Sequence, residues 1–241
     1  MDYAVARNSL TLVNDYFKHQ RFRTPKQKKL NFRMKLQDLT IREYLEKTAS
    51  GNPVPGGGCA SAFSGAIASA LISMVANLTI GKKGHASVEG RMREIIREME
   101  GNIDFFLENI DRDAEVYSRV MDAYKMPKES GEEIVARSEA IENAMKQASL
   151  VPMGIAEKAL GMMDTIIEVV QKGNRNAVTD GMVSIMACRS AIMGTVLSVR
   201  INISGLKDRA FVATLTEKCD RIEREATAKE RSMLDWVKST L

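Results

Sequence analysis

The chain has 241 residues, 44% of them hydrophobic and 27% charged, the ordinary balance of a globular protein with a sizeable core. Aromatic residues make up only 5%, which favours closely packed helices over sheets. The formal charge is +4, but residues 1–33 hold eight Lys or Arg against two Asp, a net of +6, so the remainder has a net of −2. A slightly acidic body argues against a nucleic-acid-binding protein, which needs a basic stripe on its folded surface.

The polar and basic residues 1–33 are interpreted as an N-terminal extension that precedes one helical domain at residues 34–241. The basic character of the chain ends at Met34, so Met34 is a candidate initiator methionine. Residues 1–33 are then a candidate artefact of a start codon assigned too far upstream. An ordinary flexible or partly helical tail is the alternative. A nucleic-acid or anionic-membrane binder would rest wholly on this extension.

Cysteine usage and the N-terminus indicate a cytoplasmic protein. Cys59, Cys188 and Cys219 are far apart and odd in number, so reduced thiols are expected. No basic segment followed by an apolar run and a small-residue cleavage site opens the chain, which argues against secretion. The two histidines, His19 and His85, have no metal-binding spacing, and we expect no metal site.

The first expected helix starts at a capping box, Thr40-Ile41-Arg42-Glu43, and ends near residue 49. No charged residue occurs between Lys47 and Lys82, and residues 60–78 are long enough to span a membrane. Serines dilute this stretch, and its small residues recur at four-residue spacing, which lets another helix come close. We therefore expect a buried central helix or a subunit interface, and no membrane association.

The rest of the chain also reads as helical, since no strand-like alternation persists beyond a few residues. A proline after Met126 ends one helix, Pro152 opens or kinks another, and Thr179-Asp180 can cap a further one. The expectation is an all-α, dimer-forming bundle of long antiparallel helices. The expected helices are residues 87–124, 132–150, 152–172, 179–202 and 208–238.

Asp113 is the candidate catalytic residue, because it lies on an apolar helix face. Steps of three and four residues carry this stripe through Phe106, Ile110, Asp113, Tyr117 and Val120 to Tyr124. A carboxyl group that faces a core is costly unless paired or protonated, and desolvation raises its pKa toward the range useful for proton transfer. The alternative is a structural ion pair with an inward-facing arginine; the candidate partners are Arg137, Arg189 and Arg200.

The turn at residues 53–58, Pro-Val-Pro-Gly-Gly-Gly, is a candidate wall of a binding site, because three residues without side chains let a flat ligand come close to the backbone. Amides at a helix N-terminus bind anions, but no strand precedes this turn. The Gly-x-Gly-x-x-Gly spacing is absent, and no Lys-Ser or Lys-Thr pair follows the last glycine. A plain tight turn into a buried helix is the alternative. Lys82 and Lys83 are interpreted as a solvated basic corner that is also available to a carboxylate ligand.

Taken together, these residues resemble the cyclodeaminase/cyclohydrolase family, which comprises the C-terminal module of formiminotransferase-cyclodeaminase and free-standing methenyltetrahydrofolate cyclohydrolases. The likeness runs collinearly from about residue 36 to 211. Cys59, Ser198 and Ile134 depart from the family, which usually has serine, asparagine and lysine at these positions. The motifs that carry the resemblance are residues 55–62, 74–83, 111–115 (Asp-Arg-Asp-Ala-Glu), 126–128, 173–174, 179–180 and 199–202.

The resemblance implies an all-helical homodimer, or a dimer of dimers, that takes a tetrahydrofolate derivative as substrate and holds no permanent cofactor. It implies the formiminotetrahydrofolate cyclodeaminase reaction, with the cyclohydrolase reaction as the alternative and a non-catalytic folate-binding or partner-binding scaffold as a third. A separate formiminotransferase is a possible partner. The second aspartate of the acidic motif, Asp113, corresponds to the family's catalytic residue. The other expected substrate-binding residues are Gly56, Gly57, Gly58, Lys82, Lys83, Asp180 and Asn202.

Overall fold

The computed structural model describes residues 34–240, of which residues 35–240 form one compact unit. The described residues contain six α-helices and no β-strand, so the predicted all-α class is confirmed. The predictions for residues 1–33 lie outside the described residues. The helices are α2 (Ile41–Thr48), α3 (Gly57–Asn77), α4 (Glu89–Tyr124), α5 (Gly131–Lys172), α6 (Val178–Ile203) and α7 (Arg209–Thr240), with short 3-10 turns η1 (Leu36–Asp38), η2 (Ala86–Val88) and η3 (Arg175–Ala177).

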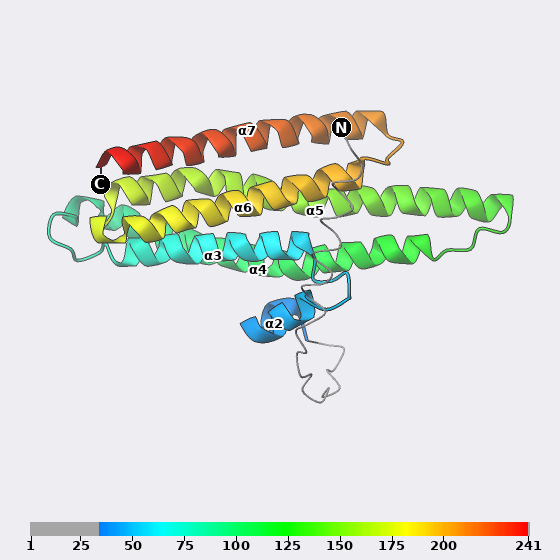
Figure 1. The fold of residues 1–241 in the computed structure, drawn as a ribbon, viewed down its shortest axis with the longest axis horizontal. Helices are drawn as coiled ribbons and strands as arrows, with labels where there is room; N and C mark the ends of the chain where they lie inside the picture. Colours follow the sequence, from blue (N-terminus) through cyan, green and yellow to red (C-terminus); the bar gives the residue numbers. More distant parts are fainter. Residues whose placement is uncertain (1–33, 241) are drawn as a thin grey trace, which may run out of the picture. The chain divides into compact units, whose positions relative to one another are not determined.

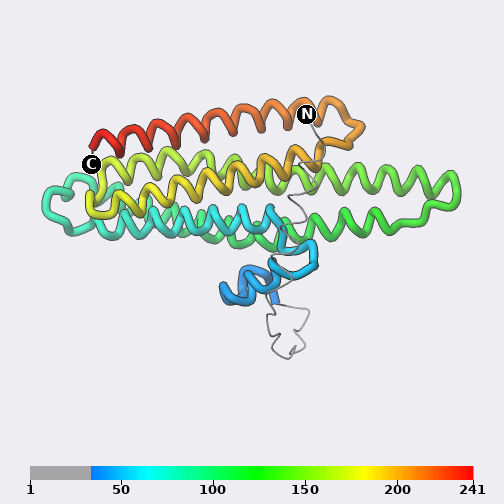
Figure 2. The backbone as a smooth tube through the Cα atoms, in the orientation of Figure 1, coloured from blue at the N-terminus to red at the C-terminus, as the bar shows by residue number. Residues whose placement is uncertain are grey.

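Helices α3 to α6 form an up-and-down bundle in which each helix packs on the next and α6 returns to pack on α3. Short connections force successive helices to run antiparallel, as Figure 1 shows. Helix α7 packs along α5 and α6. The backbone tube shows that the hairpin of α4 and α5 reaches well past the start of α3 and the end of α6 (Figure 2).

Small side chains allow α3 to lie in the centre of this bundle. A Cβ atom at Gly65 would lie 2.6 Å from the buried ring of Phe106 on α4. On its other side, the Ser184 hydroxyl of α6 donates a 2.8 Å hydrogen bond to the carbonyl of Ala68. The close approach that the spacing of small residues predicted is therefore present on two sides of α3.

Two helices, α3 and the stretch Arg175–Ile203 that contains α6, are long and apolar enough to cross a membrane by length and composition alone. Within the bundle, 56% and 50% of their most apolar windows are buried. Such partly buried central helices pass the same test in proteins that never meet a membrane, because a core helix is also apolar.

The prediction of two helices at residues 132–150 and 152–172 was wrong, because α5 is continuous and Pro152 lies inside it. Proline has no amide hydrogen, so the carbonyl of Ala148 loses its usual helical donor. The side-chain nitrogen of Asn202 on α6 replaces that donor at 2.8 Å. A hydrogen bond from another helix thus satisfies the acceptor that the proline leaves free.

The predicted cap of α6 at Thr179-Asp180 was also wrong, although the predicted start lies within one residue of the observed start. Asn174 caps the 3-10 turn η3, which runs directly into α6 at Val178. Asp180 therefore lies within the first turn of α6 and does not cap it. The capping box at Thr40 is confirmed: its side chain accepts from the amide of Glu43, whose carboxylate accepts from Thr40 in return.

Candidate active site

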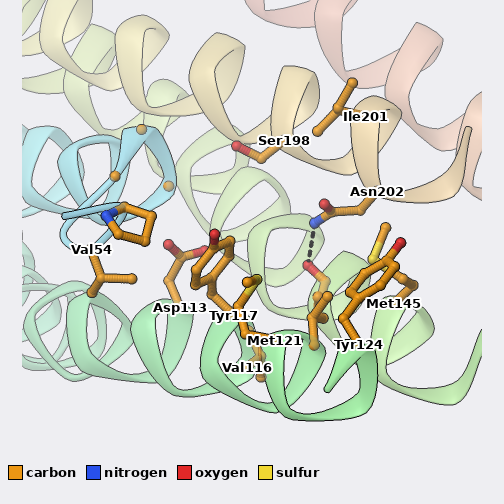
Figure 3. A pocket seen from close by; sticks show the side chains of 16 residues that line it. Val54, Asp113, Val116, Tyr117, Met121, Tyr124, Met145, Ser198, Ile201 and Asn202 are labelled. Carbon is orange, nitrogen blue, oxygen red and sulfur yellow. Dashed lines mark hydrogen bonds between the residues drawn. The ribbon is translucent and has the colours of Figure 1, made fainter. Parts of the chain in front are cut away.

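A cavity of about 410 Å³ lies between the first turn of α3, the last third of α4, and the facing parts of α5 and α6. Figure 3 shows Asp113 and Tyr117 on α4 opposite Ser198 and Asn202 on α6. This volume falls within the range of small-molecule sites. The lining residues are Pro53, Val54, Gly56, Gly57, Gly58, Asp113, Val116, Tyr117, Val120, Met121, Tyr124, Met145, Ala148, Ser198, Ile201 and Asn202.

The glycine turn allows the carboxyl group of Asp113 to reach the backbone of α3. Gly56 is the N-cap residue, and the first amides of α3 have no carbonyl acceptor within the helix. A Cβ atom at Gly58 would lie 2.4 Å from both carboxyl oxygens of Asp113. Any side chain at this position would occupy the space that the carboxyl group now fills.

Asp113 has a thiol as its side-chain partner and no arginine. The Cys59 thiol donates to Oδ2 of Asp113 at 3.3 Å. The alternative of a structural ion pair is therefore wrong, because each arginine that could have supplied it is bound elsewhere. Arg137 donates to the carbonyl of Tyr124, Arg189 pairs with Glu230, and Arg200 pairs with Asp220 and Glu223.

Burial raises the pKa of Asp113, and hydrogen bonds from the thiol and amide of Cys59 lower it, with burial the larger effect. Among residues 34–240, no Lys or Arg that could reverse this balance lines the cavity, and Asp113 is the only charged residue that does. The site therefore offers one carboxyl group, biased toward its protonated form, to whatever ligand enters.

The other aspartate of the acidic motif has a different task. Asp111 accepts hydrogen bonds from the amide of Leu36 at 2.6 Å and from the amide of Gln37 at 3.3 Å. It therefore anchors η1 against α4, and it is absent from the cavity lining. Two residues along a helix turn the side chain by about 200°, which explains why neighbouring aspartates face different surroundings.

The apolar walls of the cavity were not named as site residues from the sequence. Tyr117 lies one helical turn after Asp113 on the same face, so the stripe contained the signal for it. Met145 and Ser198 come from helices whose register against α4 only the fold shows. The wall residues contributed by α4 are Val116, Tyr117, Val120, Met121 and Tyr124.

Among the residues expected to bind substrate, Gly56, Gly57, Gly58 and Asn202 line the cavity together with Asp113. One N–H of the Asn202 side chain is donated to the Ala148 carbonyl, which leaves its second N–H and its oxygen for a ligand. Figure 3 shows this hydrogen bond among the lining residues, between Asp113 on one side and Tyr124 on the other.

The remaining expected residues, Lys82, Lys83 and Asp180, do not line this cavity. The lysines stand between two glycines with φ of 73° and 88°, in the connection that follows the other end of α3. Since α3 has 21 residues, about 30 Å of helix separates that end from the glycine turn. Asp180 is at the start of α6, whereas the cavity contacts its last turns.

Residues 40–221 match the protein family described as Formiminotransferase-cyclodeaminase. The chain belongs to this family. Its acidic motif, its glycine turn and the cavity between them thus lie within the matched segment. No group of three or more potential metal-ligating side chains is found among residues 34–240.

Individual relatives agree with this membership. A methenyltetrahydrofolate cyclohydrolase from Methylorubrum extorquens is 36% identical over 83% of this chain and 96% of its own length. The formimidoyltransferase-cyclodeaminase of Rattus norvegicus is 26% identical over 83% of this chain, which spans only 37% of that protein. A formiminotetrahydrofolate cyclodeaminase from Thermotoga maritima superimposes with a TM-score of 0.74 at 28% identity, covering 84% of this chain and 99% of that one.

Proposed function

We propose that this protein catalyses acid/base chemistry on the one-carbon bridge between N5 and N10 of tetrahydrofolate, with Asp113 transferring the proton. The observation that carries the proposal is the partly buried carboxyl group of Asp113 in a cavity whose described lining has no other charged residue. The named relatives act on methenyl or formimino derivatives of tetrahydrofolate. Both reactions require a general acid/base.

The charge of the ligand is complementary to the cavity. The methenyl bridge carries a positive charge shared between its two nitrogens, and a protonated formimino group is also a cation. One carboxyl group without a competing Lys or Arg suits such a ligand. Flat pteridine and aminobenzoyl rings suit walls made of Tyr117, Met121 and Met145, because these side chains present apolar surface.

Of the two reactions, we favour the cyclohydrolase reaction, in which water adds to the methenyl carbon and the ring opens to a formyl group. The relative with 36% identity over nearly its whole length is named for that activity, whereas the named cyclodeaminases are 26–28% identical. The second candidate is ring closure of 5-formiminotetrahydrofolate, in which the N10 nitrogen attacks the formimino carbon and ammonia leaves. The structural match to the Thermotoga maritima protein supports it.

The two reactions are distinguished by supplying purified protein with each substrate and following the absorbance of the methenyl group. A cyclohydrolase consumes methenyltetrahydrofolate faster than buffer does. A cyclodeaminase produces it from 5-formiminotetrahydrofolate with release of ammonia. If neither absorbance changes, the protein is a non-catalytic scaffold and the proposal is wrong.

Replacing Asp113 by Asn removes the transferable proton and keeps the shape of the side chain. We expect kcat to fall roughly 100- to 10,000-fold, the usual contribution of a general acid/base, while the helical circular dichroism spectrum stays unchanged. Glu108→Gln, at an exposed carboxylate on α4, serves as the matched control. Full activity in the Asp113→Asn variant would remove this residue from the mechanism.

We also propose that the active form is a homodimer joined through α3 and α6. Every exposed residue of these two helices is uncharged, including Ile67, Met74, Val183, Leu197 and Ile201. We call these exposed residues the uncharged surface; apolar side chains gathered on two neighbouring helices are typical of a subunit interface.

This dimer bears on the two lysines that lie away from the cavity. The cavity lies at one end of the uncharged surface, since Ile201 belongs to both. In an antiparallel pair, Lys82 and Lys83 of a second copy would approach that end. There they would be available to the carboxylates of the folate tail, for which the part of the cavity lining within residues 34–240 has no cation.

A further inference from the structure

The thiol of Cys59 occupies a fully buried position between two acceptors. Its Sγ atom lies 3.3 Å from Oδ2 of Asp113 and 3.3 Å from the carbonyl oxygen of Ile110. The cysteine is 0% exposed, so no solvent competes for either contact. A thiol has a single hydrogen and can donate to only one of the two oxygens at a time.

We propose that Cys59 is a positioning residue that sets the protonation of Asp113, because its thiol can exchange its hydrogen bond between this carboxyl group and the Ile110 carbonyl. When Asp113 is ionised, the thiol donates to Oδ2. When Asp113 is protonated, the thiol donates to the Ile110 carbonyl instead. Oδ2 is then free of the thiol hydrogen and can carry the proton of the carboxyl group. The catalytic meaning of this exchange rests on the proposed function, but the exchange itself does not.

The thiol remains a neutral donor throughout this cycle. Burial, followed by the charge of Asp113, raises the pKa of Cys59 to about 12, so it does not ionise at the pH at which Asp113 titrates. Because a thiol is a weak donor, it stabilises the carboxylate less than a hydroxyl would. Serine at this position would therefore favour the ionised form of Asp113.

The other groups that face Asp113 do not supply a competing charge. On α2, Tyr44 is 7% exposed, and its hydroxyl has no hydrogen-bond partner among the described residues. Burial and the nearby Cys59 and Asp113 raise the pKa of Tyr44, so it also stays neutral. On α4 the neighbouring cavity residue is Tyr117, and α5 and α6 contribute no titratable side chain to the cavity. Among the described residues, Cys59 is thus the side-chain donor to Asp113 that substitution can strengthen or remove.

The test is a direct titration of the Asp113 carboxyl carbon by ¹³C NMR in the folded, ligand-free protein, with the resonance assigned from Asp113→Asn. We expect Cys59→Ser to lower the pKa of Asp113 by about 0.5–1 pH unit, because a hydroxyl is the stronger donor to a carboxylate. We expect Cys59→Ala to raise it by a similar amount. Cys188→Ser, at another buried thiol that donates to a carbonyl, is the matched control and should leave the titration unchanged.

Unchanged titration in both Cys59 variants, with folding verified by circular dichroism, would overturn the inference. So would a shift of the same sign in Ser and Ala, since that would reflect general loosening of the site. In the assay, the limb of the kcat/KM pH profile that belongs to Asp113 should move in the same direction as its titration. If the titrations shift as expected but no folate substrate reacts, the proposed function fails while the role of Cys59 stands.

Discussion

At the scale of single residues, the two aspartates of the acidic motif show how position along a helix decides which surroundings a side chain faces. Asp113 falls on the apolar stripe and lines the cavity, while Asp111 lies off it and binds backbone amides of η1. Spacing alone predicted the inward position of Asp113, because side chains three and four residues apart share a helix face. It could not predict the thiol partner, since Cys59 is 54 residues away in the chain.

The contact between Gly58 and Asp113 gives a sharp prediction. We expect Gly58→Ala to lower kcat/KM at least about 100-fold, because the methyl group would occupy the space of the carboxyl oxygens and a displacement of about 1 Å is enough for such a loss. Steady-state kinetics on the preferred folate substrate measures the effect.

Gly161→Ala is the control for that experiment, because no atom lies within 4 Å of its added methyl group and the residue is far from the cavity. It should retain full activity and gain up to about 1 kcal/mol of stability from the better helix propensity of alanine. Equal activity in both alanine variants would show that the glycine turn does not hold the carboxyl group.

At the scale of elements, hydrogen bonds between chain segments decide where helices continue. Composition and prolines indicated that a helix should break at Pro152, yet α5 continues through it. The compensating donor, Asn202, belongs to α6 and is 54 residues away in the sequence from the acceptor, Ala148. No local signal could reveal this contact, which is also why Asn202 has a structural role in addition to its place in the cavity.

A second such contact fastens the connections at the end of the bundle away from the cavity. The hydroxyl of Thr79 is fully buried, donates to the Val75 carbonyl at 2.8 Å, and accepts from the amide of Asn174 at 2.9 Å. The side chain of Asn174 in turn donates to the Leu78 carbonyl. These bonds tie the α3–α4 connection to the α5–α6 connection.

We expect Thr79→Val to lower the free energy of unfolding by about 1–3 kcal/mol, since it leaves the Asn174 amide without a partner in a partly buried position. Thr79→Ser keeps the hydroxyl and should lose less, because only a methyl group is removed. Urea denaturation followed by circular dichroism compares the two. If valine and serine were equally destabilising, the hydroxyl would not be the fastening group.

At the scale of the whole molecule, the uncharged surface of α3 and α6 predicts the oligomeric state. We expect a dimer at micromolar concentration, and we expect Leu197→Glu to weaken it at least about 100-fold by burying an unpaired charge in the interface. Sedimentation equilibrium measures both constants.

Val135→Glu provides the control, because Val135 is similarly exposed at 57% but lies near the start of α5, away from this surface. It should dimerise as the unchanged protein does. A monomeric unchanged protein, or equal weakening by the two glutamates, would show that α3 and α6 do not form the interface.

The sequence by itself determined the helical class, the approximate extent of most helices and the inward position of Asp113, because these depend on composition, capping residues and spacing along a single helix. Only the tertiary structure decided which arginines stay away from Asp113, which thiol touches it, and how α5 passes through Pro152. It also separated Lys82, Lys83 and Asp180 from the cavity within one chain. These features depend on the register between helices that are distant in the chain, and helix register follows from packing that no local pattern contains.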